Sequence, residues 1–312
     1  MLCCIVSITQ LTTCADKCRR SNTMIFVKSE DLKYGMRLAK PIYNKTGVLL
    51  YERNTRLTLQ GIESVKNFGL LGLYILEPAE PVPPMSEEDL DFERFQTMAV
   101  FSIREELDNI IAGREPVNLK RLANAIITNY GRLDHKITFT QNLRSTTDYV
   151  YKHVINTAIL CALISAQVYY TPTEQEELVL AALLHDIGKL LLPNKVREKY
   201  DDYDTNDLII VKKIQNDGLG LLRPEIGIDS GVRRIVAQIH RMEYGNSNLE
   251  QGKILKSTKI LKVANLFDTM TCMKISEEAI SEIAAIKYLL LNKDEFDEEI
   301  VGALIKSINI LT

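Results

Sequence analysis

The sequence predicts a mainly helical protein with a small α/β module towards its N-terminal end. From about residue 144 onward, nearly every segment carries apolar residues at helical spacing. The preceding segment, residues 24–80, instead combines short apolar runs with a single helical pattern. Apolar residues make up 46% of the chain and charged residues 25%, a balance typical of a globular protein with a sizeable core.

The α/β module is predicted from four strand-like runs and one helical pattern. The runs are residues 25–27, 38–43, 48–51 and 70–76. The second and third flank the turn Asn-Lys-Thr-Gly at 44–47, which predicts a β-hairpin. Residues 58–68 place Ile62 and Val65 on one face, as expected of a helix. Together these elements define residues 24–80 as a small module that mixes strands and a helix.

Residues 1–23 do not fit this module. They hold a short apolar run followed by basic residues, which is the wrong order for a secretory signal. Cys14 and Cys18 are spaced like a metal-binding pair, but the segment offers no second pair to complete four ligands. We interpret residues 1–23 as disordered or as an upstream extension, with Met24 as a candidate initiator.

Residues 81–143 are expected to form a linker followed by helices. Three prolines among acidic residues, at 81, 83 and 84, restrict the chain to extended conformations. Ser86 is then placed as an N-cap before an acidic first turn. Helices are predicted over 86–112 and 117–130.

The last predicted region, residues 144–312, is a helical domain that makes up more than half of the chain. Helices are expected at 150–168, 174–184, 205–216, 230–243, 256–272, 276–290 and 296–309. Thr173 is the expected N-cap of the second of them.

The net charge and the cysteine content limit which binding partners and which cellular compartment are expected. The formal net charge is -3 and the pI is about 5.9, so no broad basic field is present and no DNA or RNA partner is expected. No run of roughly 18 apolar residues occurs, so no membrane span is predicted. Cys161 and Cys272 fall within apolar helical patterns and are expected to be buried, not bridged. A reducing cytoplasm is therefore the expected location.

Histidine and aspartate residues of the helical domain suggest a site. His185 and Asp186 are adjacent, and His153 and His240 lie on other predicted helices. Imidazole and carboxylate together suit Mn, Fe or Zn. Asp186 directly follows an apolar run, and burying it is costly unless it is paired or coordinated. Lys189 adds a cation nearby. From the residues alone, a metal or phosphate site and a structural role both remain open.

Residues 148–196 resemble the HD superfamily of metal-dependent phosphohydrolases, specifically its HD-GYP branch. The segment 148–156, Asp-Tyr-Val-Tyr-Lys-His-Val-Ile-Asn, is similar to the first metal-binding helix of that branch. Residues 181–189, Ala-Ala-Leu-Leu-His-Asp-Ile-Gly-Lys, match its signature, and residues 261–271 are similar to a later helix. The resemblance covers most of residues 24–309 and implies an HD-type helical bundle.

The resemblance also implies an activity and a set of site residues. Members of this branch cleave cyclic di-GMP at a centre of two or three metals, where metal-activated water attacks phosphorus. A divalent metal such as Mn or Fe and a cyclic dinucleotide ligand are therefore expected. The N-terminal module has no evident catalytic residues, and we expect it to serve in sensing or in formation of a homodimer. Asp186 and Lys189 are the implied catalytic residues, with Lys189 also contacting the substrate phosphate. The implied metal ligands are His153, His185, Asp186, His240 and Asn265.

The chain departs from the family pattern at several of these positions. Ile214 and Ile239 stand where the pattern has histidine ligands, and isoleucine has no lone pair to donate. Asn265 stands where an aspartate is expected and lacks the negative charge that holds a hard dication. Asp268 matches a separate aspartate of the pattern, so we do not expect it to replace the lost ligand. The Gly-Tyr-Pro sequence itself is absent from residues 243–247.

Three hypotheses follow from these departures. The first is a nucleotide-signalling or regulatory protein related to cyclic di-GMP phosphodiesterases, with weakened or lost hydrolysis, and we favour it. The second is an active phosphodiesterase with a reduced metal site. The third is a non-catalytic scaffold or interaction protein in which His185 and Asp186 make structural hydrogen bonds. Losing ligands lowers metal affinity steeply, which is why we place the first and third hypotheses together above the second.

Overall fold

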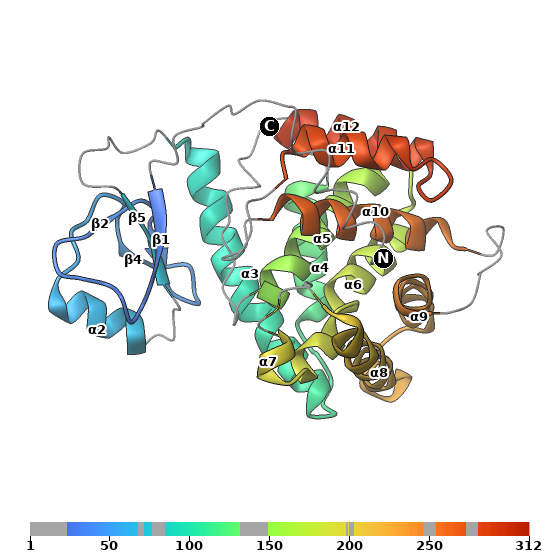
Figure 1. Ribbon diagram of the computed structural model, residues 1–312, viewed down its shortest axis with the longest axis horizontal. Helices are drawn as coiled ribbons and strands as arrows, with labels where there is room; N and C mark the ends of the chain where they lie inside the picture. The colour runs from blue at the N-terminus through green and yellow to red at the C-terminus, as the bar shows by residue number, and fades with distance from the viewer. Residues whose placement is uncertain are drawn as a thin grey trace. The chain divides into compact units, whose positions relative to one another are not determined.

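The chain forms two compact units. The structure, a computed structural model, describes residues 24–67, 72–76, 85–131, 149–197, 199, 203–245, 254–272 and 280–311 (Figure 1). The first unit comprises Met1–Ile42 and Leu50–Pro84, and the second comprises Tyr43–Leu49 and Met85–Thr312. The interpretation of residues 1–23 falls outside the described part.

The N-terminal module contains a three-stranded antiparallel sheet. Strands β1 (Met24–Lys28) and β2 (Arg37–Leu38) both pair with β5 (Gly72–Leu76), which gives the order β1-β5-β2. Helix α2 (Leu59–Asn67) buries Ile62 and Val65. Strands β3 (Ile42–Tyr43) and β4 (Leu49–Tyr51) form the predicted hairpin. The module has a core of its own, formed by Leu32, Leu38, Ile42, Leu57, Ile62, Val65, Leu73 and Ile75.

The second unit is almost entirely helical, which confirms the predicted fold class. Its α-helices are α3 (Glu87–Ile111), α4 (Leu119–Tyr130), α5 (Tyr149–Gln167), α6 (Pro172–Leu184), α7 (Asn194–Arg197), α8 (Thr205–Leu221), α9 (Ser230–Tyr244), α10 (Lys256–Thr271), α11 (Glu282–Leu291) and α12 (Glu298–Leu311). Two short 3-10 helices, η1 (Ile187–Leu191) and η2 (Pro224–Ile226), lie between them. Helices α10, α11 and α12 pack together (Figure 1).

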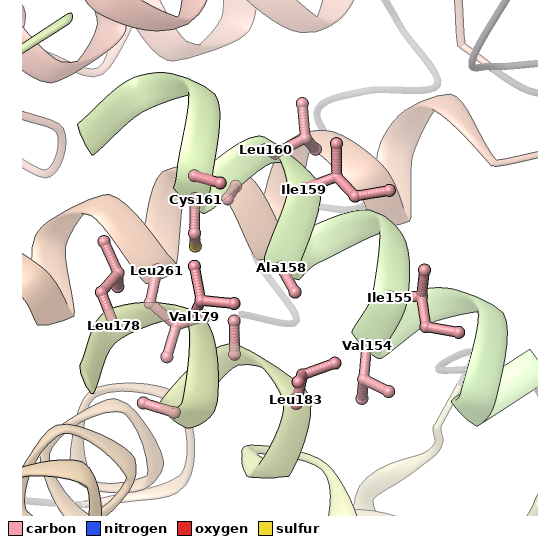
Figure 2. Packing of buried hydrophobic residues seen from close by; sticks show 14 of the residues in the cluster. Val154, Ile155, Ala158, Ile159, Leu160, Cys161, Leu178, Val179, Leu183 and Leu261 are labelled. Atoms are coloured by element: carbon pink, nitrogen blue, oxygen red, sulfur yellow. The ribbon is translucent and has the colours of Figure 1, made fainter. Parts of the chain in front are cut away.

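Helix α5 is the centre of the helical unit. It packs against α3, α4, α6, α10 and α12, and its residues from His153 to Ser165 are all buried. Figure 2 shows apolar side chains of α5, α6 and α10 gathered in this core, with Cys161 among them. In length and composition α5 is apolar enough to cross a membrane, but 89% of its most apolar window is buried inside the protein. Its apolar surface is therefore covered by neighbouring helices.

The start of α6 differs from the prediction. Its N-cap is Thr171, so the prediction of Thr173 is wrong. The Thr171 hydroxyl accepts a hydrogen bond from the Glu174 backbone N–H, and the Glu174 carboxylate accepts one from the Thr171 backbone N–H. This reciprocal capping box requires a spacing of three residues. Pro172 fits the first helical position because its missing N–H is not needed there.

Other helix boundaries also differ from the predicted ones. Helix α8 was expected to end at residue 216 but continues to Leu221. Helix α11 begins at Glu282, where the Ser281 hydroxyl accepts a hydrogen bond from the Ala284 backbone N–H. The earlier part of the helix expected at 276–290 includes residues 276–279, which lie outside the described residues.

Candidate metal centre

The His185-Asp186 pair lies where one helix ends and the next begins. His185 is the C-cap of α6, and Asp186 is the N-cap of η1. The turn is held tightly, because Gly188 of η1 lies against Gly218 of α8. A Cβ added to Gly218 would be 2.6 Å from the Cα of Gly188. This close approach fixes η1 against α8 and sets the direction in which the Asp186 side chain leaves the turn.

Three donor atoms converge at this turn. His153, from the middle of α5, places its Nε2 3.5 Å from Asp186 Oδ2. His185 places its Nε2 3.6 Å from the same oxygen. The three atoms lie within 4.8 Å of one another, and all three residues are buried. The arrangement brings together the first three of the residues expected to bind a metal.

In both histidine rings, the hydrogen bond made by Nδ1 determines that Nε2 faces the other donor atoms. His185 Nδ1 lies 2.8 Å from the Ala182 carbonyl oxygen, which only accepts, so Nδ1 carries the proton. His153 Nδ1 lies 2.6 Å from Asp268 Oδ2 and donates to that carboxylate in the same way. Both rings therefore direct Nε2 inward. This is the orientation that second-layer partners give to metal-binding histidines.

Burial keeps His185 neutral. It lowers the pKa of His185 to about 4, so the ring is uncharged at pH 7. Within the part of the chain that the structure describes, the buried His185 Nε2 has no hydrogen-bond partner. A buried acceptor that is left unsatisfied costs free energy, and coordination of a cation would remove that cost.

Asp186 is held by two further side chains. Its Oδ1 accepts a hydrogen bond of 2.8 Å from Gln215 Nε2, and its Oδ2 lies 2.8 Å from the Lys189 ammonium. Burial alone would raise the pKa of Asp186, but Lys189, His185 and His153 together more than offset it and hold that pKa well below its usual range. Asp186 is thus an anion whose charge already has a buried cation beside it.

A second layer of polar side chains lies behind His153. Asp268 of α10 accepts from His153 through Oδ2 and from Asn156 Nδ2 through Oδ1, at 3.2 Å. Gln96 of α3 donates its Nε2 to Asn156 Oδ1 at 3.1 Å. Sequence reasoning assigned no role to Gln96, Asn156 or Gln215. Asp268 carried a signal, since a carboxylate inside an apolar helical pattern requires a partner, but nothing in the sequence identified His153 as that partner.

His240 and Asn265 do not join the three donors. His240 Nε2 lies 2.6 Å from the backbone oxygen of His185 and donates to it. His240 therefore supports the end of α6. Asn265 Nδ2 donates to Glu243 Oε1 at 2.6 Å. Among the described residues, the group of histidine and carboxylate ligands is limited to the three donors above, and the assignment of His240 and Asn265 as ligands stays a prediction.

The two isoleucines at expected ligand positions pack in apolar clusters. Ile239 is fully buried in the main core of the helical unit. Ile214 packs with a smaller cluster that includes Leu192, Val196 and Val211. Both positions thus add apolar packing where the family resemblance implies coordination.

Comparisons with known proteins agree with the geometry of the turn. Residues 118–300 match the family model described as HD domain. The chain is 26% identical over 152 residues to the cyclic di-GMP phosphodiesterase response regulator RpfG of Xanthomonas campestris pv. campestris, across 47% of this chain and 40% of that protein. It is 22% identical over 171 residues to the cyclic di-GMP phosphodiesterase PA4108 of Pseudomonas aeruginosa, across 54% of this chain and 41% of that protein. The chain thus spans less than half the length of these curated relatives.

A solved structure shares the fold. Bd1817, an HDG"Y"P protein from Bdellovibrio bacteriovorus, aligns with a TM-score of 0.56 over 92% of this chain and 99% of that one, at 16% identity. At that identity the likeness concerns the fold alone. The family match covers more than half of the chain and contains the His185-Asp186 turn, so this chain belongs to the HD domain family.

Proposed function

We propose that the helical unit is a nucleotide-signalling domain that holds one divalent metal and binds a cyclic dinucleotide, with hydrolysis much weaker than at a complete HD-GYP centre. The observation that carries the proposal is the convergence of His153 Nε2, His185 Nε2 and Asp186 Oδ2 within 4.8 Å. Two imidazoles and one carboxylate are a donor set suited to Mn or Fe. The names of the curated relatives support cyclic di-GMP as the ligand to test first.

The residues around the three donors have distinct tasks in this proposal. A metal held there would polarise a phosphoryl oxygen and lower the pKa of a bound water. Asp268 keeps the His153 lone pair directed inward, and Gln215 keeps Asp186 Oδ2 turned towards the donors. Lys189, which lies 2.8 Å from Asp186 Oδ2, supplies the charge that would contact the substrate phosphate.

Weak hydrolysis follows from the missing second set of ligands. A pair of metals stabilises both the attacking and the leaving oxygen of a phosphodiester. Ile214 and Ile239 offer no lone pair, and Asn265 offers no charge and donates its amide to Glu243. A single metal would therefore bind and polarise the phosphate without stabilising both oxygens.

The test is an assay of binding and hydrolysis on the full chain. The protein is purified without oxygen and loaded with Mn or Fe(II). Cyclic di-GMP binding is then measured by calorimetry, and linear product by chromatography. We expect binding that requires the metal, and a hydrolysis rate about 100-fold or more below that of a complete HD-GYP domain assayed beside it. His185→Ala is expected to abolish the metal-dependent part. Hydrolysis at the rate of the comparison domain would overturn the proposal, as would an absence of both metal and nucleotide binding.

The scaffold hypothesis is supported by one specific contact. Lys189 lies 2.8 Å from Asp186 Oδ2, so the buried carboxylate is neutralised within the protein itself. A scaffold predicts that Asp186→Asn changes the free energy of unfolding and leaves nucleotide binding unchanged. The one-metal proposal predicts that the same substitution also weakens nucleotide binding at least tenfold in the presence of metal.

A further inference from the structure

Four polar side chains connect helix α3 to the metal centre. Gln96 Nε2 donates to Asn156 Oδ1 at 3.1 Å, and Asn156 Nδ2 donates to Asp268 Oδ1 at 3.2 Å. The other oxygen of Asp268 lies 2.6 Å from His153 Nδ1. Gln96 lies on α3, Asn156 and His153 on α5, and Asp268 on α10. The four residues thus join three helices of one unit.

The direction of each hydrogen bond is dictated by chemistry. The Asp268 carboxylate only accepts, so Asn156 must turn its amide N–H group towards it. The carbonyl oxygen of Asn156 then faces Gln96, which must in turn present its own N–H group. The amide orientations of both side chains therefore follow from the charge of Asp268.

Because these groups are buried, a change in their orientation would cost free energy. The exposed fractions are 4% for Gln96, 2% for Asn156 and 3% for Asp268, and His153 is fully buried. Water has little access to replace a lost hydrogen bond at such positions, and hydrogen bonds are stronger in a low dielectric. A reversed Asn156 amide would place its oxygen against the Asp268 carboxylate. Gln96 opposes that reversal, because its N–H group pairs with the Asn156 oxygen.

Helix α3 lies ahead of the segment that matches the HD family. The match begins at residue 118, whereas α3 spans Glu87–Ile111. The family segment therefore does not include every side chain that orients His153.

We propose that Gln96 is a positioning residue of the metal centre. By fixing the amide of Asn156, it keeps both oxygens of Asp268 engaged and the His153 ring oriented with Nε2 towards Asp186. The inference rests on the proposed metal-binding function, although the orientation of His153 is measurable without metal.

The principal variant is Gln96→Met, which keeps the length of the side chain and removes the N–H donor. Thr97→Val is the matched control on the same helix, because the Thr97 hydroxyl donates within α3 to the Glu93 carbonyl at 2.9 Å. Asp268→Asn is the positive comparison, since it removes the carboxylate from His153. Gln96→Asn, which retracts the amide by one methylene, serves as a second variant in case Gln96→Met does not fold.

Two readouts decide the proposal. The first is nitrogen NMR of the histidine rings in metal-free protein, which is tractable because the chain has 4 histidines and the His153 signal is assigned by its loss in His153→Gln. We expect the Nδ1 proton of His153 to exchange with solvent about tenfold faster in Gln96→Met than in wild type or Thr97→Val. The second readout is Mn affinity. It is expected to fall about 10-fold in Gln96→Met and up to about 100-fold in Asp268→Asn, and to stay within twofold in Thr97→Val.

The outcomes separate this inference from the proposed function. If Gln96→Met lowers the free energy of unfolding but leaves the His153 proton and the Mn affinity unchanged, Gln96 is only a packing residue and the inference is overturned. If wild-type protein binds no Mn, the proposed function fails, and the exchange of the His153 proton alone decides whether Gln96 orients the ring.

Discussion

The two carboxylate oxygens of Asp186 have different partners. Oδ1 accepts a hydrogen bond from Gln215, whereas Oδ2 lies beside Lys189 and faces His153 and His185. A metal bound by the two imidazoles would share Oδ2 with the Lys189 ammonium. The two positive charges would repel each other at one oxygen, so we expect metal loading to favour movement of Lys189 away from Oδ2.

Substituting Lys189 tests this competition. Lys189→Met leaves the buried Asp186 charge without its cation, so the metal-free protein is expected to lose about 3–5 kcal/mol of unfolding free energy. Mn is expected to restore most of the loss, because it supplies the missing positive charge. Denaturant unfolding with and without Mn measures both effects. The exposed Lys195 is the control, and Lys195→Met is expected to change stability by less than about 0.5 kcal/mol. A loss in Lys189→Met that Mn does not recover would contradict the coupling.

The depressed pKa of His185 predicts a loss of stability in acid. The ring has a pKa of about 4 in the folded state and 6.5 as its ordinary value, so only the unfolded chain takes up this proton between those values. The stability contribution is complete above pH 6.5 and is lost as the pH falls to 4, by about 3 kcal/mol in total. Unfolding of metal-free protein across this range is expected to show a shallower pH dependence in His185→Gln. An equal pH dependence of the unfolding free energy in wild type and His185→Gln would contradict the low pKa assigned to His185.

Sequence reasoning found the three inward-facing donors because each lies in a recognisable pattern. His185 and Asp186 end an apolar run, and His153 lies in a segment similar to a known helix. The orienting residues carry no such pattern. Gln96 and Asn156 are 60 positions apart, and Gln215 and Asp186 are 29 positions apart. Such pairs arise from the packing of whole helices, which local sequence does not specify.

At the scale of elements, the contact between η1 and α8 determines where the His185-Asp186 turn can lie. A Cβ on Gly218 would lie 2.6 Å from the Gly188 Cα and 2.7 Å from its N. Both neighbours are backbone atoms, so a side-chain rotation cannot relieve the overlap. Glycine at position 218 is thus required by the close approach of the two elements.

Paired alanine substitutions in α8 test this contact. Gly218→Ala is expected to cost about 1–3 kcal/mol through overpacking and to weaken Mn binding by displacing η1. Gly220→Ala is the control, because its Cβ would meet no atom within 4 Å, and it is expected to stabilise the helix by about 0.5–1 kcal/mol. Thermal unfolding and Mn titration of both variants provide the measurements. Equal effects of the two substitutions would show that the contact is not tight.

Helical periodicity predicted the α-helices longer than one turn but did not fix their ends. Helix α8 runs through Gly218 and Gly220, although glycine is a weak helix former, because packing against η1 stabilises that part of the helix. The N-cap of α6 was misplaced by two residues, since Thr171 and Thr173 both resemble caps and Glu174 selects the first. The 3-10 helix η1 was not predicted, because its geometry depends on the contact with α8.

At the scale of the whole molecule, the helical unit extends beyond the family segment. Helix α3 shares one hydrophobic core with α4, α5, α6, α9, α10, α11 and α12, and it contributes Phe92, Ile103 and Leu107. The sequence predicted a helix there but grouped it with the linker in a separate region, residues 81–143, because amphipathic spacing does not reveal which neighbour covers the apolar face. Sensing by the N-terminal module and formation of a homodimer remain predictions.

The number of metals bound per chain tests the central claim most directly. The full chain is purified without oxygen, incubated with excess Mn or Fe(II) and freed of unbound ions, and its metal content is measured by mass spectrometry. The one-metal account predicts about one ion per chain, lost in His185→Ala and retained in Asn265→Ala. Two ions per chain, or an ion that persists in His185→Ala, would contradict it.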